Sequence, residues 1–297
     1  VIKRVFKLSL PRTIGSSLTN FTFIAMSAMA SLLAVGSISV FQLSYNIENT
    51  PLLVIGISYA VAAFPTMSRL FAEGNKSELL AVLYSAVRNI FFFTIPISLL
   101  IIVLRAHVVR VLLGAGSFSW NDTRLVAAAV ALFSVSVAAQ CIVLLLVRAY
   151  YAVGDTKNPL RINAIATIVT IAASIGLLVL YRDIDSFRYF IESLVRIDGV
   201  AGSTVVMLPL AFSIGQITNA LMLWYGFHKM YRGTKTENNT LARTISHMLA
   251  AGIIAAASAY TVLALAGSSV DQSTFWGVLT QASLAGVVGC VMYGIIL

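Results

Sequence analysis

The sequence predicts an all-α membrane protein, a polytopic transmembrane helix bundle of about eight spans. Hydrophobic residues make up 59% of the 297 residues and charged residues only 10%, whereas a soluble domain carries about a quarter charged residues. Mainly apolar runs recur along the chain, and a run of about 20 such residues can cross a bilayer as a helix. The runs lack the strict alternation of a membrane β-barrel. The spans are therefore expected to be helices, which hydrogen-bond their own backbone N–H and C=O groups within the hydrocarbon.

The expected spans follow one another with short connections between most of them. Gly36 and Ser37 separate the first two spans. Pro51 should kink the second span and Pro96 the third, because proline lacks the backbone N–H that a helix needs. The eight spans are residues 12–35, 38–64, 82–104, 124–147, 160–180, 204–227, 243–266 and 274–297.

Two stretches outside these spans have an amphipathic pattern. Residues 76–88 alternate apolar and polar side chains at helical spacing, which predicts an interfacial lead-in to the third span. The connection 181–203 mixes seven charged residues with aromatic and aliphatic ones. It should form a short amphipathic helix on the outer surface.

The charges of the connections alternate along the chain, and this sets the expected orientation. Cations concentrate at one side of the membrane, which the positive-inside rule places in the cytoplasm. We therefore expect the net charge of +9 to reflect topology rather than nucleic-acid binding, and both ends of the chain to be cytoplasmic. The thirteen cations on the cytoplasmic side are Lys3, Arg4, Lys7, Arg12, Arg69, Lys76, Arg148, Lys157, Arg161, Lys229, Arg232, Lys235 and Arg243; the six on the outer side are Arg105, Arg110, Arg124, Arg182, Arg188 and Arg196.

Catalytic chemistry has no recognisable motif in this sequence. The three histidines fall in separate connections or span ends, and the motifs HExxH and GxSxG and a P-loop are missing. Cys141 and Cys290 lie in apolar runs without metal-type spacing, so we interpret both as small hydrophobic residues. We predict no enzyme, no cofactor and no metal site.

Three connections carry informative strings of residues. Residues 64–75 read FPTMSRLFAEGN, residues 148–159 read RAYYAVGDTKNP, and residues 112–123 read LLGAGSFSWNDT. Each contains turn-forming residues, and Pro159 suits the first turn of a helix. The strings resemble the "FPxLSR…AEG", "RAFYALGDTKTP" and "GxF…DT" motifs of the MurJ/MviN family of lipid II flippases, within the multidrug/oligosaccharidyl-lipid/polysaccharide exporter superfamily. LPRTIG at 10–15 is similar to the family's start of the first of these spans.

The resemblance covers nearly the whole chain and implies transport by alternating access. The chain would be the C-terminal half of a fourteen-helix flippase in the bacterial cytoplasmic (inner) membrane, with its N-terminal lobe missing. Residues 1–232 would form the second six-helix lobe and residues 233–297 an extra helix pair. The implied partners are lipid II or a similar polyprenyl-pyrophosphate-linked sugar, and membrane lipids. The chain also opens at Val1 in a basic stretch and stops at Leu297 in an apolar run, which fits a piece of a longer protein.

The sequence departs from the family in the second span. Members commonly carry an arginine just before the kinking proline, where this chain has Asn46, with Glu48 nearby. Three explanations stay open: the first half carries the cationic cavity, the substrate differs, or this copy is divergent and inactive. The rival functions are a polysaccharide-unit or drug exporter of the same superfamily, and a non-transporting membrane scaffold.

Polar residues inside the spans are the candidates for a substrate cavity, because polar groups in hydrocarbon face the bundle interior or a cavity. Glu48 is the carboxylate within a span, and it could hold a proton or a cation. Gln42, Asn46 and Asn49 are spaced by four and three residues, so they should share one helical face with Glu48 slightly off it. We expect Glu48 to matter more for transport than Gln140. In the last two spans, Ala256 and Gly286 are candidates for a groove that takes a lipid tail. The cavity candidates are Gln42, Asn46, Glu48, Asn49, Asn20, Arg12, Gln216 and Asn219.

Overall fold

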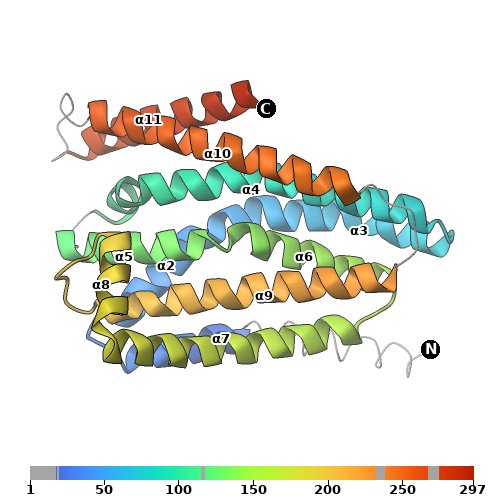
Figure 1. The fold of residues 1–297 in the computed structure, drawn as a ribbon, viewed down its shortest axis with the longest axis horizontal. Coiled ribbons are helices and arrows are strands. Elements are labelled where there is room, and N and C mark those ends of the chain that lie inside the picture. Colours follow the sequence, from blue (N-terminus) through green and yellow to red (C-terminus); the bar gives the residue numbers. More distant parts are fainter. Residues whose placement is uncertain (1–17, 19, 115–117, 232–237, 267–273) are drawn as a thin grey trace.

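The fold is a bundle of long helices that run along a common axis, with one short helix lying across one end (Figure 1). The structure is a computed structural model, and it describes residues 18, 20–114, 118–231, 238–266 and 274–297. The described residues are helical or form turns, with no strand among them. This confirms the all-α prediction.

The helices follow the expected spans closely. A helical segment at 20–31 precedes them, and the predicted first span otherwise begins outside the described residues. The elements are α2 (Ser37–Pro51), the π-helical turn η1 (Leu52–Gly56), α3 (Ile57–Ala72), α4 (Lys76–Leu113), α5 (Trp120–Ser134), α6 (Val137–Ala152), α7 (Lys157–Asp183), α8 (Asp185–Val195), the 3-10 turn η2 (Ser203–Val206), α9 (Met207–Met230), α10 (Asn238–Ala266) and α11 (Phe275–Ile296).

Within the described residues, six helical stretches are long and apolar enough to cross a membrane. A seventh is present if α5 and α6, which bend by 45° at their junction, count as one span. The prediction of about eight spans is consistent with this count, since the first predicted span starts in residues that the structure does not describe.

Local signals in the sequence account for the helix ends. Gly74 and Gly154 adopt positive φ angles of 74° and 80° at the turns after α3 and α6, a conformation that glycine reaches without steric cost. Asn75 caps α4 by accepting a hydrogen bond from the backbone N–H of Glu78. Ser119 and Asp122 form a reciprocal capping box at the start of α5. The turns expected from the first two strings are therefore present, and the end of the third string caps α5, while its residues 115–117 lie outside the described residues.

The two prolines behave differently. Pro51 ends α2 and is followed directly by η1, an irregular turn of the kind that breaks the regular hydrogen-bond ladder. Pro96 does not interrupt α4, which runs over 38 residues. Proline cannot donate to the carbonyl four residues earlier, which here belongs to Phe92. The Tyr293 hydroxyl of α11 donates to that carbonyl at 3.0 Å and takes the missing place.

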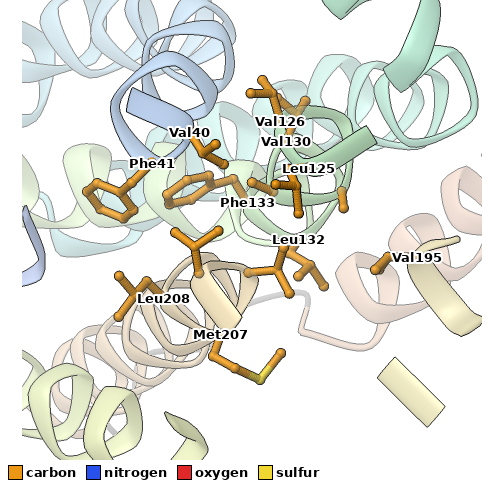
Figure 2. Packing of buried hydrophobic residues seen from close by; sticks show 14 of the residues in the cluster. Val40, Phe41, Leu125, Val126, Val130, Leu132, Phe133, Val195, Met207 and Leu208 are labelled. Carbon is orange, nitrogen blue, oxygen red and sulfur yellow. The ribbon is translucent and has the colours of Figure 1, made fainter. Parts of the chain in front are cut away.

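Two apolar clusters form the core of the bundle. Figure 2 shows part of the first, where Phe41 of α2, Phe133 of α5 and Leu208 of α9 are among the buried side chains. The second joins α3, α4, α6 and α9 through residues such as Leu83 and Tyr150. Both clusters include residues of α4 and α9 but from different stretches of each helix, so the middle of the bundle lies between them.

Residues 76–88 differ from their expected role. They form the first part of α4, and Leu79, Leu83 and Val87 are buried in the second cluster. Their apolar face therefore contacts protein instead of lying along the membrane surface. Arg88 is exposed. The connection 181–203 does contain a short amphipathic helix, α8, which lies across the end of the bundle (Figure 1).

The connections divide between two ends of the bundle as the cation pattern requires. The α3–α4 turn, the α6–α7 turn and the end of α9 gather at one end, whereas α8 and the start of α5 lie at the other (Figure 1). Which end faces the cytoplasm stays a prediction.

Candidate functional site

A buried polar chain crosses the middle of the bundle and is the most informative site in it. Glu48 of α2 is fully buried, with 0% of its surface exposed. The Gln140 side-chain amide of α6 donates to Glu48 Oε1, and it also lies 3.1 Å from Ser136 Oγ. Ser136 Oγ is 3.1 Å from Ser213 Oγ of α9. Four side chains thus link three helices between the two apolar clusters.

The same residues explain the bend between α5 and α6. Neither proline nor glycine is present at the junction, 134–137. Instead, Ser134 Oγ donates to the Val130 carbonyl at 2.7 Å and Ser136 Oγ donates to the Phe133 carbonyl at 2.9 Å. Serine hydroxyls that bond to the preceding turn compete with the helical ladder and bend helices.

Ser213 stabilises this junction from the neighbouring helix. Its hydroxyl donates to the Leu132 carbonyl at 2.7 Å, so α9 satisfies a backbone group near the end of α5. The serine hydroxyls of the bend and the Leu132 carbonyl therefore find partners inside the protein, as hydrocarbon surroundings require.

Glu48 is only partly satisfied by these contacts. Its second carboxylate oxygen, Oε2, is buried and has no hydrogen-bond partner among the described residues. A buried carboxyl group that is ionised and unpaired is costly in an apolar interior. Glu48 is therefore a buried acidic residue with one carboxylate oxygen left without a partner among the described residues, which fits the idea of a proton or cation site.

The three neutral polar residues of α2 lie on its less buried side, and Glu48 lies further from them around the helix than expected. Gln42 and Asn46 are exposed and Asn49 is half-buried, whereas Glu48 is buried. At about 100° per residue, Glu48 lies roughly 200° around the helix from Asn46. The structure thus separates Glu48, which points into the lobe, from Gln42 and Asn46, which point away from it.

The remaining cavity candidates are scattered. Asn20 is exposed and Gln216 is half-buried, while Asn219 is buried with its side-chain carbonyl unpartnered among the described residues. Arg12 lies outside the described residues. The structure brings none of these next to Glu48 by a hydrogen bond that it records.

Sequence reasoning missed the role of Gln140, Ser136 and Ser213. Gln140 was expected to be a less important residue than Glu48, yet the two side chains are direct partners. Their effects on transport are therefore not independent. The sequence did show several polar residues within the apolar run 124–147. It did not show that Gln140 pairs with Glu48 of α2, which is 92 residues away.

The last two helices pack on α4 through small residues. A Cβ at Gly289 would lie 2.6 Å from Leu100 Cδ2, and one at Gly252 would lie 2.9 Å from Leu99 Cδ1. These glycines therefore permit close helix contact. Ala256 and Gly286 are half-buried beside this seam. A lipid groove at these two positions stays a prediction. Of the cysteines, Cys141 is buried as expected, but Cys290 of α11 is exposed.

Comparison with known proteins places this architecture in one family. The family model described as lipid II flippase MurJ matches residues 1–280. A probable lipid II flippase MurJ from Rhizobium tropici is 30% identical over 174 residues, which cover 59% of this chain and 32% of that protein. The lipid II flippase MurJ from Burkholderia cenocepacia is 23% identical over 228 residues, covering 77% and 40%.

A solved structure has the same fold. It is a lipid II flippase MurJ in an inward closed conformation, with a TM-score of 0.71 and 19% sequence identity, and the match covers 99% of this chain and 54% of that one. The chain thus spans about half of that structure, and the aligned part spans well under half of each curated relative. With the family model matched over nearly its whole length, the chain belongs to the MurJ lipid II flippase family.

Proposed function

We propose that this chain is the second lobe and C-terminal helix pair of a flippase that moves lipid II, or a closely similar polyprenyl-pyrophosphate-linked sugar, across the bacterial cytoplasmic membrane by alternating access. The match of the family model over residues 1–280 carries the proposal. The partner lobe would come from the part of the relatives that this chain does not span.

The face of α2 that points away from the rest of the lobe, with Gln42 and Asn46, supports the proposal. Gln42 and Asn46 are exposed within a span, where a lipid-facing position would be apolar. Polar side chains at such depth face a water-filled cavity or other protein. We therefore assign this face to the substrate path between the two lobes. No cofactor is needed, because translocation makes and breaks no covalent bond.

The test measures exposure of lipid II at the outer surface of cells depleted of their own flippase. The full-length protein should restore exposure, and the double variant Gln42→Leu/Asn46→Leu should reduce it while still folding. The matched control is Thr261→Val, since Thr261 is an exposed polar residue on α10, away from α2. Equal loss in both variants would contradict the assignment of the face.

The same assay separates the rival functions. An exporter of another substrate would leave lipid II inside while moving a different lipid-linked sugar or drug. A scaffold would move none of these substrates, although cells could still need it for wall assembly. Either result in the full-length protein would refute the proposed flippase.

A further inference from the structure

A cavity of about 700 Å³ opens at the end of the bundle that carries α8, away from the buried polar chain. Residues of α4, α5, α10 and α11 and the C-terminal end of α8 line it. Three arginines contribute to the lining, namely Arg105 of α4, Arg124 of α5 and Arg196 just after α8, and the lining contains no acidic residue.

The end of α8 holds two of these arginines in place. Arg105 donates to the Val195 carbonyl at 2.9 Å, and Arg124 donates from Nε and Nη2 to the Arg196 carbonyl at 3.2 and 2.9 Å. Arg196 has a φ of 60°, which ends the helix. Cations at a helix C-terminus are favourable, so a purely structural role explains part of this arrangement.

The bonds of Arg105 and Arg124 to backbone carbonyls leave most of the positive charge of the three arginines without a negative partner. Among the described residues, the ion pairs within 4.0 Å are Arg69–Glu73 and Arg188–Asp185, so none of the three lining arginines has a carboxylate at that distance. Arg124 also donates to the backbone carbonyl of Asp198 at 3.4 Å. The Arg196 side chain makes no hydrogen bond that the structure records, and each guanidinium carries five N–H donors. Arg105 and Arg124 are half-buried and Arg196 is exposed, and like charges gathered in this way repel one another until an anion binds them.

The surroundings of the cavity indicate what kind of anion fits. Tyr260 and Ala264 of α10 line it, and they lie on one exposed helical face with Ala257 and Ile253. That apolar stripe runs from the cavity along α10 for about 10 Å. Trp120, 57% exposed, stands at the rim, as aromatic residues do at the level of lipid headgroups.

We propose that this cavity binds the phosphate headgroup of an anionic phospholipid, with one acyl chain lying along the exposed stripe of α10. Three cations favour a headgroup of net negative charge over a zwitterionic one, because the lining holds no carboxylate to pair with a headgroup amine. The site is separate from the substrate path proposed at α2, and it does not depend on that function.

The experiment uses Trp120 as the reporter in the full 297-residue chain. The chain has three tryptophans, and Trp224→Phe with Trp276→Phe leaves Trp120 alone. Quenching is compared in vesicles that contain brominated phosphatidylglycerol or brominated phosphatidylcholine. Phosphatidylglycerol should quench more strongly at the same lipid fraction. Equal quenching by the two lipids would overturn the proposal.

A charge variant with a matched control tests the contact itself. Arg196→Gln should lower the relative binding constant for phosphatidylglycerol about fivefold, which corresponds to one surface cation, and Arg196→Lys should retain most of it. Arg188→Gln is the control, since Arg188 is on α8 but pairs with Asp185 outside the cavity. Equal effects of Arg196→Gln and Arg188→Gln would mean a general surface potential and no site.

A third arm distinguishes the source of the phosphate. Inorganic phosphate is added at constant ionic strength while quenching by phosphatidylglycerol is followed. Retained quenching supports the lipid headgroup. Loss of quenching would assign the cavity to free anions and overturn the lipid proposal. Circular dichroism of each variant confirms that it has folded.

Discussion

Replacing Gln140 by leucine should destabilise the chain more than replacing its partner Glu48 does. In Gln140→Leu, Oε1 of the fully buried Glu48 carboxyl loses its partner, and Oε2 has none among the described residues, so both oxygens are left unpaired. In Glu48→Leu, the Gln140 amide keeps Ser136 as a partner at 3.1 Å. Because an orphaned buried polar group costs more than a pair removed together, the two single variants should differ.

The expected magnitudes follow from this asymmetry. Gln140→Leu should lower the free energy of unfolding by about 1–3 kcal/mol. Glu48→Leu should cost less, and the double variant should be about as stable as Glu48→Leu alone. The coupling energy between the two positions should be roughly 0.6–1.7 kcal/mol, the range that membrane proteins show for interhelical hydrogen bonds.

The assay is unfolding of the purified chain in mixed micelles with increasing sodium dodecyl sulfate, followed by circular dichroism. Ser44→Ala is the matched control, since Ser44 is buried on the same face of α2 but its hydroxyl bonds only to carbonyls of its own helix. Additive costs for the two single variants, with no coupling, would refute the inferred contact. So would a Glu48→Leu variant less stable than Gln140→Leu.

Three further predictions test the packing and the topology. Tyr293→Phe should cost about 1 kcal/mol of unfolding free energy in the same micelle assay, because it leaves a carbonyl of α4 unpaired, whereas Tyr260→Phe at an exposed position should not. Gly215→Ala should destabilise by about 1–3 kcal/mol, since a methyl group there overlaps the Thr170 side chain of α7; wild-type stability would mean that the helices lie further apart. In a background without native cysteines, an impermeant thiol reagent should label intact cells with a cysteine at Ser186 but not at Asn158, and the reverse pattern would invert the topology.

The helices and their ends could be predicted because their signals are local. The turns after α3 and α6 fall at Gly74 and Gly154, where the strings of turn residues predicted them, and both glycines have positive φ angles. A continuous apolar run of span length needs no knowledge of its neighbours to be identified. Fold class and the order of helices therefore followed from the sequence alone.

The interior of the site could not be predicted, because it depends on contacts between distant residues. Whether Pro96 breaks α4 depends in part on a hydroxyl supplied by Tyr293, about 200 residues later. The bend between α5 and α6 has serines where a proline or glycine would have been the recognised signal. Glu48 has a partner 92 residues away, and it is buried on the side of α2 away from Gln42 and Asn46, further around the helix than the position slightly off their face that the spacing suggested.

The polar residues of the spans therefore fall into two groups, those with hydrogen-bond partners inside the lobe and those exposed on its surface. Glu48, Gln140 and Ser213 find partners within the lobe, so they report on how the lobe holds its shape. Gln42 and Asn46 find none inside it, and hydrocarbon offers none, so they report on what meets the lobe from outside. The departure from the family's arginine falls at Asn46, on this second face. It changes what the lobe presents to a substrate or a partner lobe, and it leaves the internal contacts that build the fold untouched.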